Sequence, residues 1–173
     1  MKKNVWTFGL IAGAICTLWM IIFTTISIKE HFDHGMIYGY TMMIMAFAFI
    51  FVAVKNYRDK FNNGAVSFGK AFLIGLYITL IASTFYVVTW LIDFYYFIPD
   101  FMEDYTACVM EKLKAGGASA AELQEKTTEM ASFKEMYKNP FFNAAVTYIE
   151  ILPVGLLISL ISAAILKRKP VKV

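Results

Sequence analysis

Four long apolar runs with almost no charge constrain the fold of this 173-residue chain more than any other feature. They cover residues 4–28, 35–54, 71–92 and 141–166. A helix rises about 1.5 Å per residue, so about 20 residues cross a hydrocarbon core of roughly 30 Å. Backbone polar groups in lipid must be hydrogen-bonded within their own segment, which selects helices. The runs predict one domain, residues 1–173, that is an all-α membrane protein with four transmembrane helices in a lipid bilayer.

The composition agrees with a membrane protein, because 59% of the residues are hydrophobic and 17% are charged. Soluble domains contain roughly 45–50% apolar residues. The N-terminus also fits a cleaved signal peptide, since Lys2 and Lys3 precede an apolar stretch that contains Ala12, Gly13 and Ala14. The apolar run continues to Ile28, however, much further than the hydrophobic region of a signal peptide. We therefore expect an uncleaved first span.

Basic residues indicate the orientation of the helices. Ten of them flank one set of helix ends: Lys2, Lys3, Lys55, Arg58, Lys60, Lys70, Lys167, Arg168, Lys169 and Lys172. The short loop between the first two runs carries only Lys29. By the positive-inside rule, both termini and the second loop are expected in the cytoplasm and residues 93–140 outside. The same rule explains the basic residues, so nucleic acid is not an expected partner.

Residues 99–139 predict an extracytoplasmic amphipathic helical hairpin between the third and fourth spans. Pro99 can open its first helix, and Ser119 with Glu122 has the capping-box form of a second helix start. Each helix has one less polar stripe, which must be buried against the other helix, the membrane surface or a partner. The segment from Asp93 onward is rich in acids: Asp93, Asp100, Glu103, Asp104, Glu111, Glu122, Glu125, Glu129 and Glu135.

Small residues four positions apart predict where the spans pack, because helices in lipid associate through close backbone approach. Such stripes occur in the first, third and fourth runs, at Gly9 and Gly13, at Gly75, Thr79 and Ser83, and at Gly155 and Ser159. We expect them to close a four-helix bundle within one chain. The alternative is a homo-oligomer, with the first-run stripe placed between chains. The second run is rich in Met and Phe, which predicts a peripheral, lipid-facing helix.

Glu150 is the one acid inside a predicted span, and it makes an intramembrane polar site with Pro153. A charged carboxylate in lipid is costly, so Glu150 should face the other helices and be protonated or paired. Pro153 frees the carbonyl of Ile149 and kinks the helix. An acid beside an interrupted helix is typical of ion-coupled transporters. A neutral carboxyl that only hydrogen-bonds to neighbouring hydroxyls is the structural alternative.

A second candidate site lies in the first loop, where His31, Asp33 and His34 stand close together in sequence. His31 and His34 are three residues apart, which suits a transition-metal or pH-sensing site if the first helix continues. Polar residues are also ordinary in a short loop, and the chain has only these two histidines. We expect no metal and no cofactor. Phosphate-binding glycine loops, zinc-protease motifs and nucleophile elbows are absent from the sequence, so we do not expect an enzyme.

Three segments resemble an uncharacterised family of small four-span bacterial membrane proteins, found mostly in Bacteroidota and designated domain of unknown function 4199. The segments are Phe8-Gly9-Leu10-Ile11-Ala12-Gly13, Tyr57-Arg58-Asp59-Lys60-Phe61 and Ser67-Phe68-Gly69-Lys70-Ala71-Phe72. The resemblance extends over about residues 9–166. It implies a bacterial inner (cytoplasmic) membrane protein with four helices. No activity, cofactor or catalytic residue is implied by it.

Two functions fit these features. The first is a non-enzymatic accessory or scaffold protein, in which the acidic hairpin docks another membrane or periplasmic protein. The alternative is a proton- or ion-coupled transporter or channel, expected to be oligomeric because four helices enclose little space, in which Glu150 titrates. Polar residues along a water-filled path at Glu150 would favour transport, and a dry, tightly packed interior would favour interaction.

Overall fold

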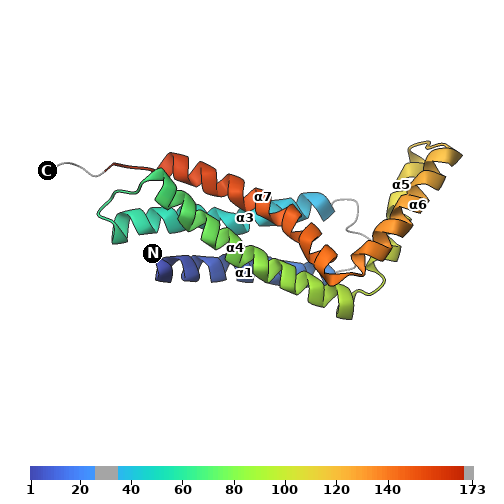
Figure 1. Cartoon of the computed structure of the whole chain (residues 1–173), viewed down its shortest axis with the longest axis horizontal. Helices are drawn as coiled ribbons and strands as arrows, with labels where there is room; N and C mark the ends of the chain where they lie inside the picture. Colours follow the sequence, from blue (N-terminus) through green and yellow to red (C-terminus); the bar gives the residue numbers. More distant parts are fainter. Residues whose placement is uncertain (26–34, 170–173) are drawn as a thin grey trace.

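A computed structural model describes residues 1–25 and 35–169, which fold into helices (Figure 1). The long helices are α1 (Lys2–Thr25), α3 (Gly35–Asn56), α4 (Phe68–Ile92) and α7 (Pro140–Leu166). Between α4 and α7 lie α5 (Phe101–Ala115) and α6 (Ala120–Tyr137), and single π-helical turns, η1 (Tyr57–Phe61) and η2 (Asp93–Phe97), extend α3 and α4. The four long helices lie side by side in Figure 1, and α5 and α6 project from one end.

The four long helices correspond to the four predicted spans, and each is long and apolar enough to cross a membrane. The ends of these helices differ from the predicted ends at places where the helix includes charged residues that the prediction left outside. The first helix begins at Lys2, and α4 begins at Phe68 because the Ser67 side chain accepts a hydrogen bond from the Lys70 amide. Lys70 is therefore in the first turn of α4. Residues 26–28 of the predicted first span are outside the described residues.

Helices α4 and α7 pack most closely, through the small residues of their facing stripes. A Cβ on Gly75 would stand 2.7 Å from the Ser159 Cβ, and a Cβ on Gly155 would collide with the Thr79 side chain. The Ser159 hydroxyl donates to the Gly155 carbonyl at 2.7 Å, which leaves its oxygen to accept from Thr79 at 3.3 Å. Close backbone approach and this buried hydroxyl pair hold the two helices together.

Side chains of α3 pack against α4 and α7 at the positions of Gly75 and Gly155. The prediction of a peripheral second helix is therefore wrong. Met43, Phe47 and Ile50 are buried, with exposed fractions of 2%, 0% and 0%. The Phe47 ring reaches the position that a Gly155 side chain would occupy, and Ile50 does the same at Gly75. Large side chains on one helix therefore pack into the spaces left by small residues on two others. The other side of α3 is exposed and apolar.

Helix α1 packs on α4 through the stripe that could have joined two chains. A Cβ added at Gly9 would stand 3.0 Å from Ile81, and one added at Gly13 would stand 2.9 Å from the Phe85 ring. One helical turn further on, Thr17 contacts Thr89 at 3.1 Å between their hydroxyl oxygens. The first-run stripe is therefore occupied within the chain.

Polar contacts fasten the end of the four helices that carries both termini. Asn4 is 5% exposed, donates to the Ala53 carbonyl at 2.9 Å and accepts from Asn56 at 2.7 Å. Val66 and Arg168 exchange two backbone hydrogen bonds of 3.0 and 2.8 Å. The N-terminus, the loop between α3 and α4, and the chain after α7 thus share one end, as Figure 1 shows.

A second apolar cluster joins α5 and α6 to the opposite end of the four helices. Phe94, Met102, Met130 and Tyr137 are buried together, and the Phe94 and Tyr137 rings meet edge to face at 5.2 Å. The Tyr95 hydroxyl adds a hydrogen bond of 3.0 Å to the Lys138 carbonyl. The base of the α5–α6 pair is therefore part of the apolar core.

The predicted start of the second hairpin helix at Ser119 is confirmed, whereas α5 begins at Phe101, two residues after Pro99, with Asp100 as its N-cap. Ser119 and Glu122 form both hydrogen bonds of a capping box at the start of α6. Asn139 caps α7, and Pro140 is its first residue. These caps place the turn between α5 and α6 and the junction between α6 and α7 where the sequence signals them.

The surface of the four helices is apolar along most of their length. Leu18, Ile44, Val88 and Leu157 are each about half exposed, at 60%, 55%, 49% and 58%. Exposed aromatic residues gather near both ends: Trp6, Phe61 and Phe68 at one, and Tyr96, Phe97 and Phe141 at the other. Such a surface is stable in hydrocarbon with aromatic residues at the headgroups.

Replacing Gly155 by Ala tests whether the α4–α7 contact supports the fold. The added methyl group has no room beside Thr79, so α7 must shift, and we expect a loss of about 1–3 kcal/mol in stability. Thermal unfolding of the purified chain in detergent measures the change. Gly69→Ala in α4 is the matched control, because no atom lies within 4 Å of the added Cβ. Equal melting temperatures for the two variants would contradict the proposed role of Gly155.

Candidate functional site

A cavity of about 380 Å³ lies between the four long helices at the end that carries α5 and α6. Every long helix contributes to its wall, and α5 and α6 add lining residues at one end. Its aromatic and sulfur-containing lining consists of Cys16, Trp19, Met20, Met42, Met43, Tyr86, Trp90, Phe101, Met102, Tyr105, Phe133 and Tyr137. The remaining lining residues are Thr24, Gly39, Val146, Thr147 and Glu150. The cavity therefore combines apolar walls with a few polar groups, as ligand sites do.

Glu150 lies in the wall of this cavity, on α7. Its side chain is exposed, and neither a hydrogen bond nor an ion pair connects it to another residue in the described part of the chain. The predicted hydroxyl partners do not bond to it either. Thr24 donates to the Met20 carbonyl, and Thr84 donates to the Leu80 carbonyl. Glu150 is thus a carboxyl that faces open space rather than a member of a closed network.

Four polar residues beside the cavity form a network that links α4, α6 and α7. The Trp90 indole N–H donates to Asn143 Oδ1 at 2.9 Å and to the Tyr137 hydroxyl at 3.3 Å. Thr147 donates to the Asn143 carbonyl at 2.8 Å. The network fixes the Trp90 ring, which also meets Phe101 edge to face at 4.9 Å. Burial raises the pKa of Tyr137, so its hydroxyl stays protonated in this network.

The cavity does not continue toward the end that carries the termini. The helix surfaces beyond it are filled by side chains with no exposed area, among them Phe47, Ile78 and Ile151. The tight contacts of Gly75 and Gly155 follow on the same helices. The interior is therefore open around Glu150 and close-packed in the other half.

Pro153 lies one turn beyond Glu150, and its helix is continuous from Pro140 to Leu166. In Figure 1 the ribbon of α7 changes direction part-way along its length, for which an internal proline is the common cause. The backbone near Glu150 is thus helical on both sides of the proline. It differs from the unwound segments that hold ions in transporters with discontinuous helices.

Asp93 is a buried acid. From the sequence we expected it among the acidic residues of the segment between the third and fourth spans. It begins the turn η2 and is only 5% exposed. Its Oδ2 atom has no hydrogen-bond partner among the residues that the structure describes. Asp93 therefore adds no charge to the surface of α5 and α6. Charge alone could not reveal this, because the burial of Asp93 depends on the packing around η2.

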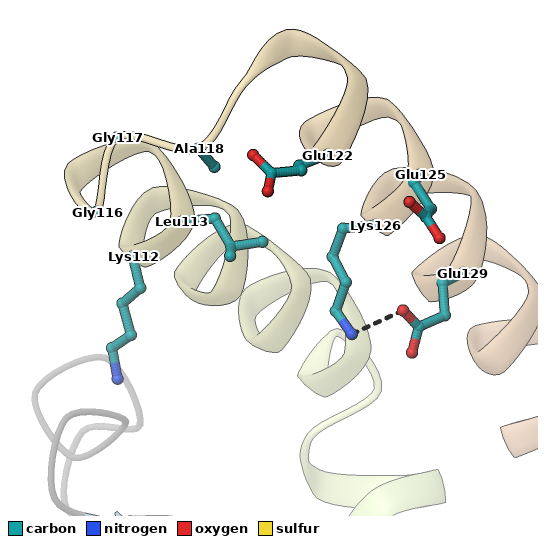
Figure 2. A pocket seen from close by; sticks show the side chains of 9 residues that line it. All are labelled: Lys112, Leu113, Gly116, Gly117, Ala118, Glu122, Glu125, Lys126 and Glu129. Carbon is teal, nitrogen blue, oxygen red and sulfur yellow. Dashed lines mark hydrogen bonds and ion pairs between the residues drawn. The ribbon is translucent and has the colours of Figure 1, made fainter.

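The surface of α5 and α6 is charged and forms a shallow groove near the turn that joins them (Figure 2). Three acids of α6, Glu122, Glu125 and Glu129, line it together with Lys112 and Lys126. Lys126 pairs with Glu129 at 2.8 Å, as Figure 2 shows. Hydrogen bonds from the backbone and hydroxyl of the capping serine hold the pKa of Glu122 below its usual range.

A further ion pair connects the two helices, between Lys134 of α6 and Glu103 of α5. The hydrogen bond from Lys134 lowers the pKa of Glu103. The carboxyl stays charged at neutral pH. The surface of the α5–α6 pair therefore keeps its negative charges.

His31, Asp33 and His34 lie outside the described residues. Within residues 1–25 and 35–169, no three His, Cys, Asp or Glu side chains stand close enough to hold a metal ion. Of the predicted candidates, Glu150 lines the cavity, Pro153 follows it, and the packing residues lie deeper between the helices.

The spacing of polar and aromatic residues in the sequence indicates further residues near the cavity on α7 and α4. Asn143, Thr147 and Glu150 are spaced by four and three residues, which places them on one face of α7. Tyr86 and Trp90 are four apart and share a face of α4 in the same way. Polar and amphipathic residues at helical spacing within an apolar run mark the side that avoids lipid. No such pattern in the sequence indicates that α5 and α6 also line the cavity.

These four helices, with their shared core and apolar outer surface, define an all-α multi-pass membrane protein. The chain matches the family model "Protein of unknown function (DUF4199)" over residues 7–168, and it belongs to that family. The expected membership is thus confirmed. No curated protein and no solved structure matches the chain.

Replacing Trp90 by Phe tests whether the polar network fixes the outer end of the cavity. The variant keeps an aromatic ring but leaves the buried Asn143 Oδ1 with only the 3.5 Å contact from the Thr147 hydroxyl, so we expect a loss of about 1–3 kcal/mol in stability. Hydrogen exchange should also rise at the end of α6 and the start of α7. The control is Trp6→Phe, at a side chain that is 58% exposed. Unchanged exchange in the Trp90 variant would show that the network does not hold these segments.

Proposed function

We propose that this protein is a non-enzymatic inner-membrane protein that acts by binding another membrane or periplasmic protein through its α5–α6 hairpin. The observation that carries the proposal is the position of the hairpin, which projects beyond the four long helices (Figure 1). Its helices pack on each other and on the outer ends of α4 and α7. The hairpin is not needed to cross a membrane, and most of its surface is available for a partner.

Only the base and middle of the hairpin are buried. Met102, Met130 and Tyr137 are the buried residues of α5 and α6 in the structure as described. The less polar stripe of α6 is not buried near the N-terminus of that helix, where Leu123 is half-buried and Thr127 is exposed. An anchored base with an exposed far end suits a docking element, because its orientation is fixed before a partner arrives.

The charge of the hairpin favours a basic partner. Residues 99–139 contain eight acids and five lysines, a net charge of −3. Three of the acids line the groove of Figure 2, which has a volume of about 480 Å³. We infer that a basic segment of the partner binds there, since complementary charge speeds association and excludes acidic competitors.

The proposed orientation places the hairpin outside the cytoplasm. Both termini and the α3–α4 loop share one end of the four helices, and ten of the sixteen Lys and Arg residues belong to these segments. The positive-inside rule assigns that end to the cytoplasm. The hairpin and the cavity are at the opposite end.

Photo-crosslinking tests the docking surface. A photoreactive residue in place of Ala121, which is exposed near the groove, should give a discrete protein adduct in native membranes. Changing Glu125 and Glu129 to Gln in the same chain should reduce the adduct several-fold, because the attraction is electrostatic. Raising the salt concentration should weaken it in the same way.

The same photoreactive residue at Leu157 is the control, because that side chain is 58% exposed on the apolar surface of α7. It should give no adduct that responds to the Glu125 and Glu129 substitutions. An Ala121 adduct of unchanged yield in the glutamine variant, or the lack of a discrete adduct, would refute docking at this surface.

Cysteine labelling tests the orientation. A Ser119→Cys variant, in a chain whose own two cysteines are replaced by Ala, should react with a membrane-impermeant maleimide added to intact spheroplasts. A Lys167→Cys variant should react only after the membrane is opened. The reverse pattern would place the hairpin in the cytoplasm and overturn the proposal.

The second candidate function is ion-coupled transport, which the cavity at Glu150 favours. The close-packed half of the interior argues against a path through one chain, so transport would need a large movement or a second copy. Loss of a transport activity in Glu150→Gln, with an intact fold, would support this alternative.

A further inference from the structure

The cavity has apolar walls and one carboxyl group, which has no hydrogen-bond or ion-pair partner among the described residues. Glu150 is the acid among its lining residues, and Lys, Arg and His do not occur among them. Nothing in the described part of the chain bonds to the Glu150 carboxylate. In a low-dielectric site an unpaired carboxylate is costly, and a bound cation compensates that cost. The cavity therefore has an electrostatic preference that the described residues do not satisfy.

We propose that this cavity binds an amphipathic organic cation, namely an ammonium group attached to an apolar body, with the ammonium beside Glu150. The proposal goes beyond hairpin docking and does not rest on it. The ligand enters from the same side of the membrane as the hairpin, because the opposite half of the interior is closed by Phe47, Ile78 and Ile151.

The size and lining of the cavity suit the apolar body. Its volume of about 380 Å³ lies in the range of small-molecule sites, about 300–1,000 Å³. Met42 and Met43 of α3 form one part of the wall and Phe101 and Phe133 of the hairpin another. Methionine side chains are flexible and polarisable, so they adapt to apolar groups of different shapes.

Aromatic side chains beside the carboxyl suit the cation. Tyr86, Trp90 and Tyr137 line the cavity together with Glu150. Electron-rich ring faces attract ammonium groups, and such contacts strengthen when the cation is removed from water. The hydrogen bonds of Trp90 to Asn143 and Tyr137 hold its ring in place before a ligand binds. A carboxyl with aromatic neighbours selects a cation over a neutral or anionic molecule of equal size.

The ammonium chemistry has two sources, a free amphiphile and the headgroup of an amino-phospholipid. Both would place nitrogen beside Glu150 and carbon chains along the apolar wall. The experiment therefore starts without any ammonium lipid and adds one later.

Binding of radiolabelled decyltrimethylammonium to the purified full chain in an uncharged maltoside detergent is the direct measurement. We expect saturable binding that quenches tryptophan fluorescence, because Trp19 and Trp90 line the cavity and only Trp6 does not. The uncharged analogue with carbon in place of nitrogen should compete at least about tenfold more weakly.

Two variants separate the charge from the fold. Glu150→Gln keeps the shape of the side chain, so affinity for the cation should fall at least about tenfold while binding of the uncharged analogue is retained. Glu111→Gln, at an exposed residue of α5 outside the cavity, is the matched control and should bind like the wild type. An unchanged melting temperature of Glu150→Gln ensures that lost binding is not lost folding.

Added phosphatidylethanolamine distinguishes the two sources. Competition with the labelled probe assigns the site to a lipid headgroup, and unchanged binding assigns it to a free amphiphile. The proposal is overturned if the cation and its uncharged analogue bind equally, if Glu150→Gln binds the cation as tightly as the wild type, or if binding does not saturate.

Discussion

The close approach of α4 and α7 at Gly75 and Gly155 determines how the other helices are arranged. Hydrophobic burial does not drive helices together in lipid, so backbone contact and packing must do so. The glycines leave no room for a side chain, and the hydroxyls of Thr79 and Ser159 bond where the helices meet. Phe47 then fills the space that remains, which brings α3 into the core. Larger residues at the two glycines would separate all three helices.

The two ends of the four helices are held by different chemistry. At the end with the termini, short polar contacts such as those of Asn4 connect the helices. At the other end, aromatic residues of α4, α5 and α6 meet around a cavity. Aromatic rings pack at several angles and leave gaps that branched aliphatic residues would fill, so Trp90 and Tyr137 both support the hairpin and border the cavity. The protein is thus close-packed where small residues meet and open where aromatic residues meet.

Much of the fold is predictable from the sequence, and the candidate site is predictable in part. The four helices follow from apolar runs, and the caps at Ser119 and Asn139 follow from local hydrogen bonding. The position of α3 does not, because Phe47 is buried by glycines that lie far away in sequence. Glu150 stands out as a charge in a span. Its surroundings depend on how the hairpin packs on α4 and α7, and so does the burial of Asp93 at the start of η2.

The pairing of α4 with α7 also dictates the order in which the protein can be assembled. The first three long helices precede α5 and α6, whereas the partner of the glycine surface, α7, is synthesised after them. Until α7 enters the membrane, Gly75 lacks its contact with Ser159 and the Thr79 hydroxyl lacks its hydrogen-bond partner, so this part of α4 is open to lipid or to another protein. During biosynthesis the incomplete chain therefore exposes a helix-binding surface on α4. Insertion of α7 covers that surface. A chain truncated before Pro140 would keep that surface permanently.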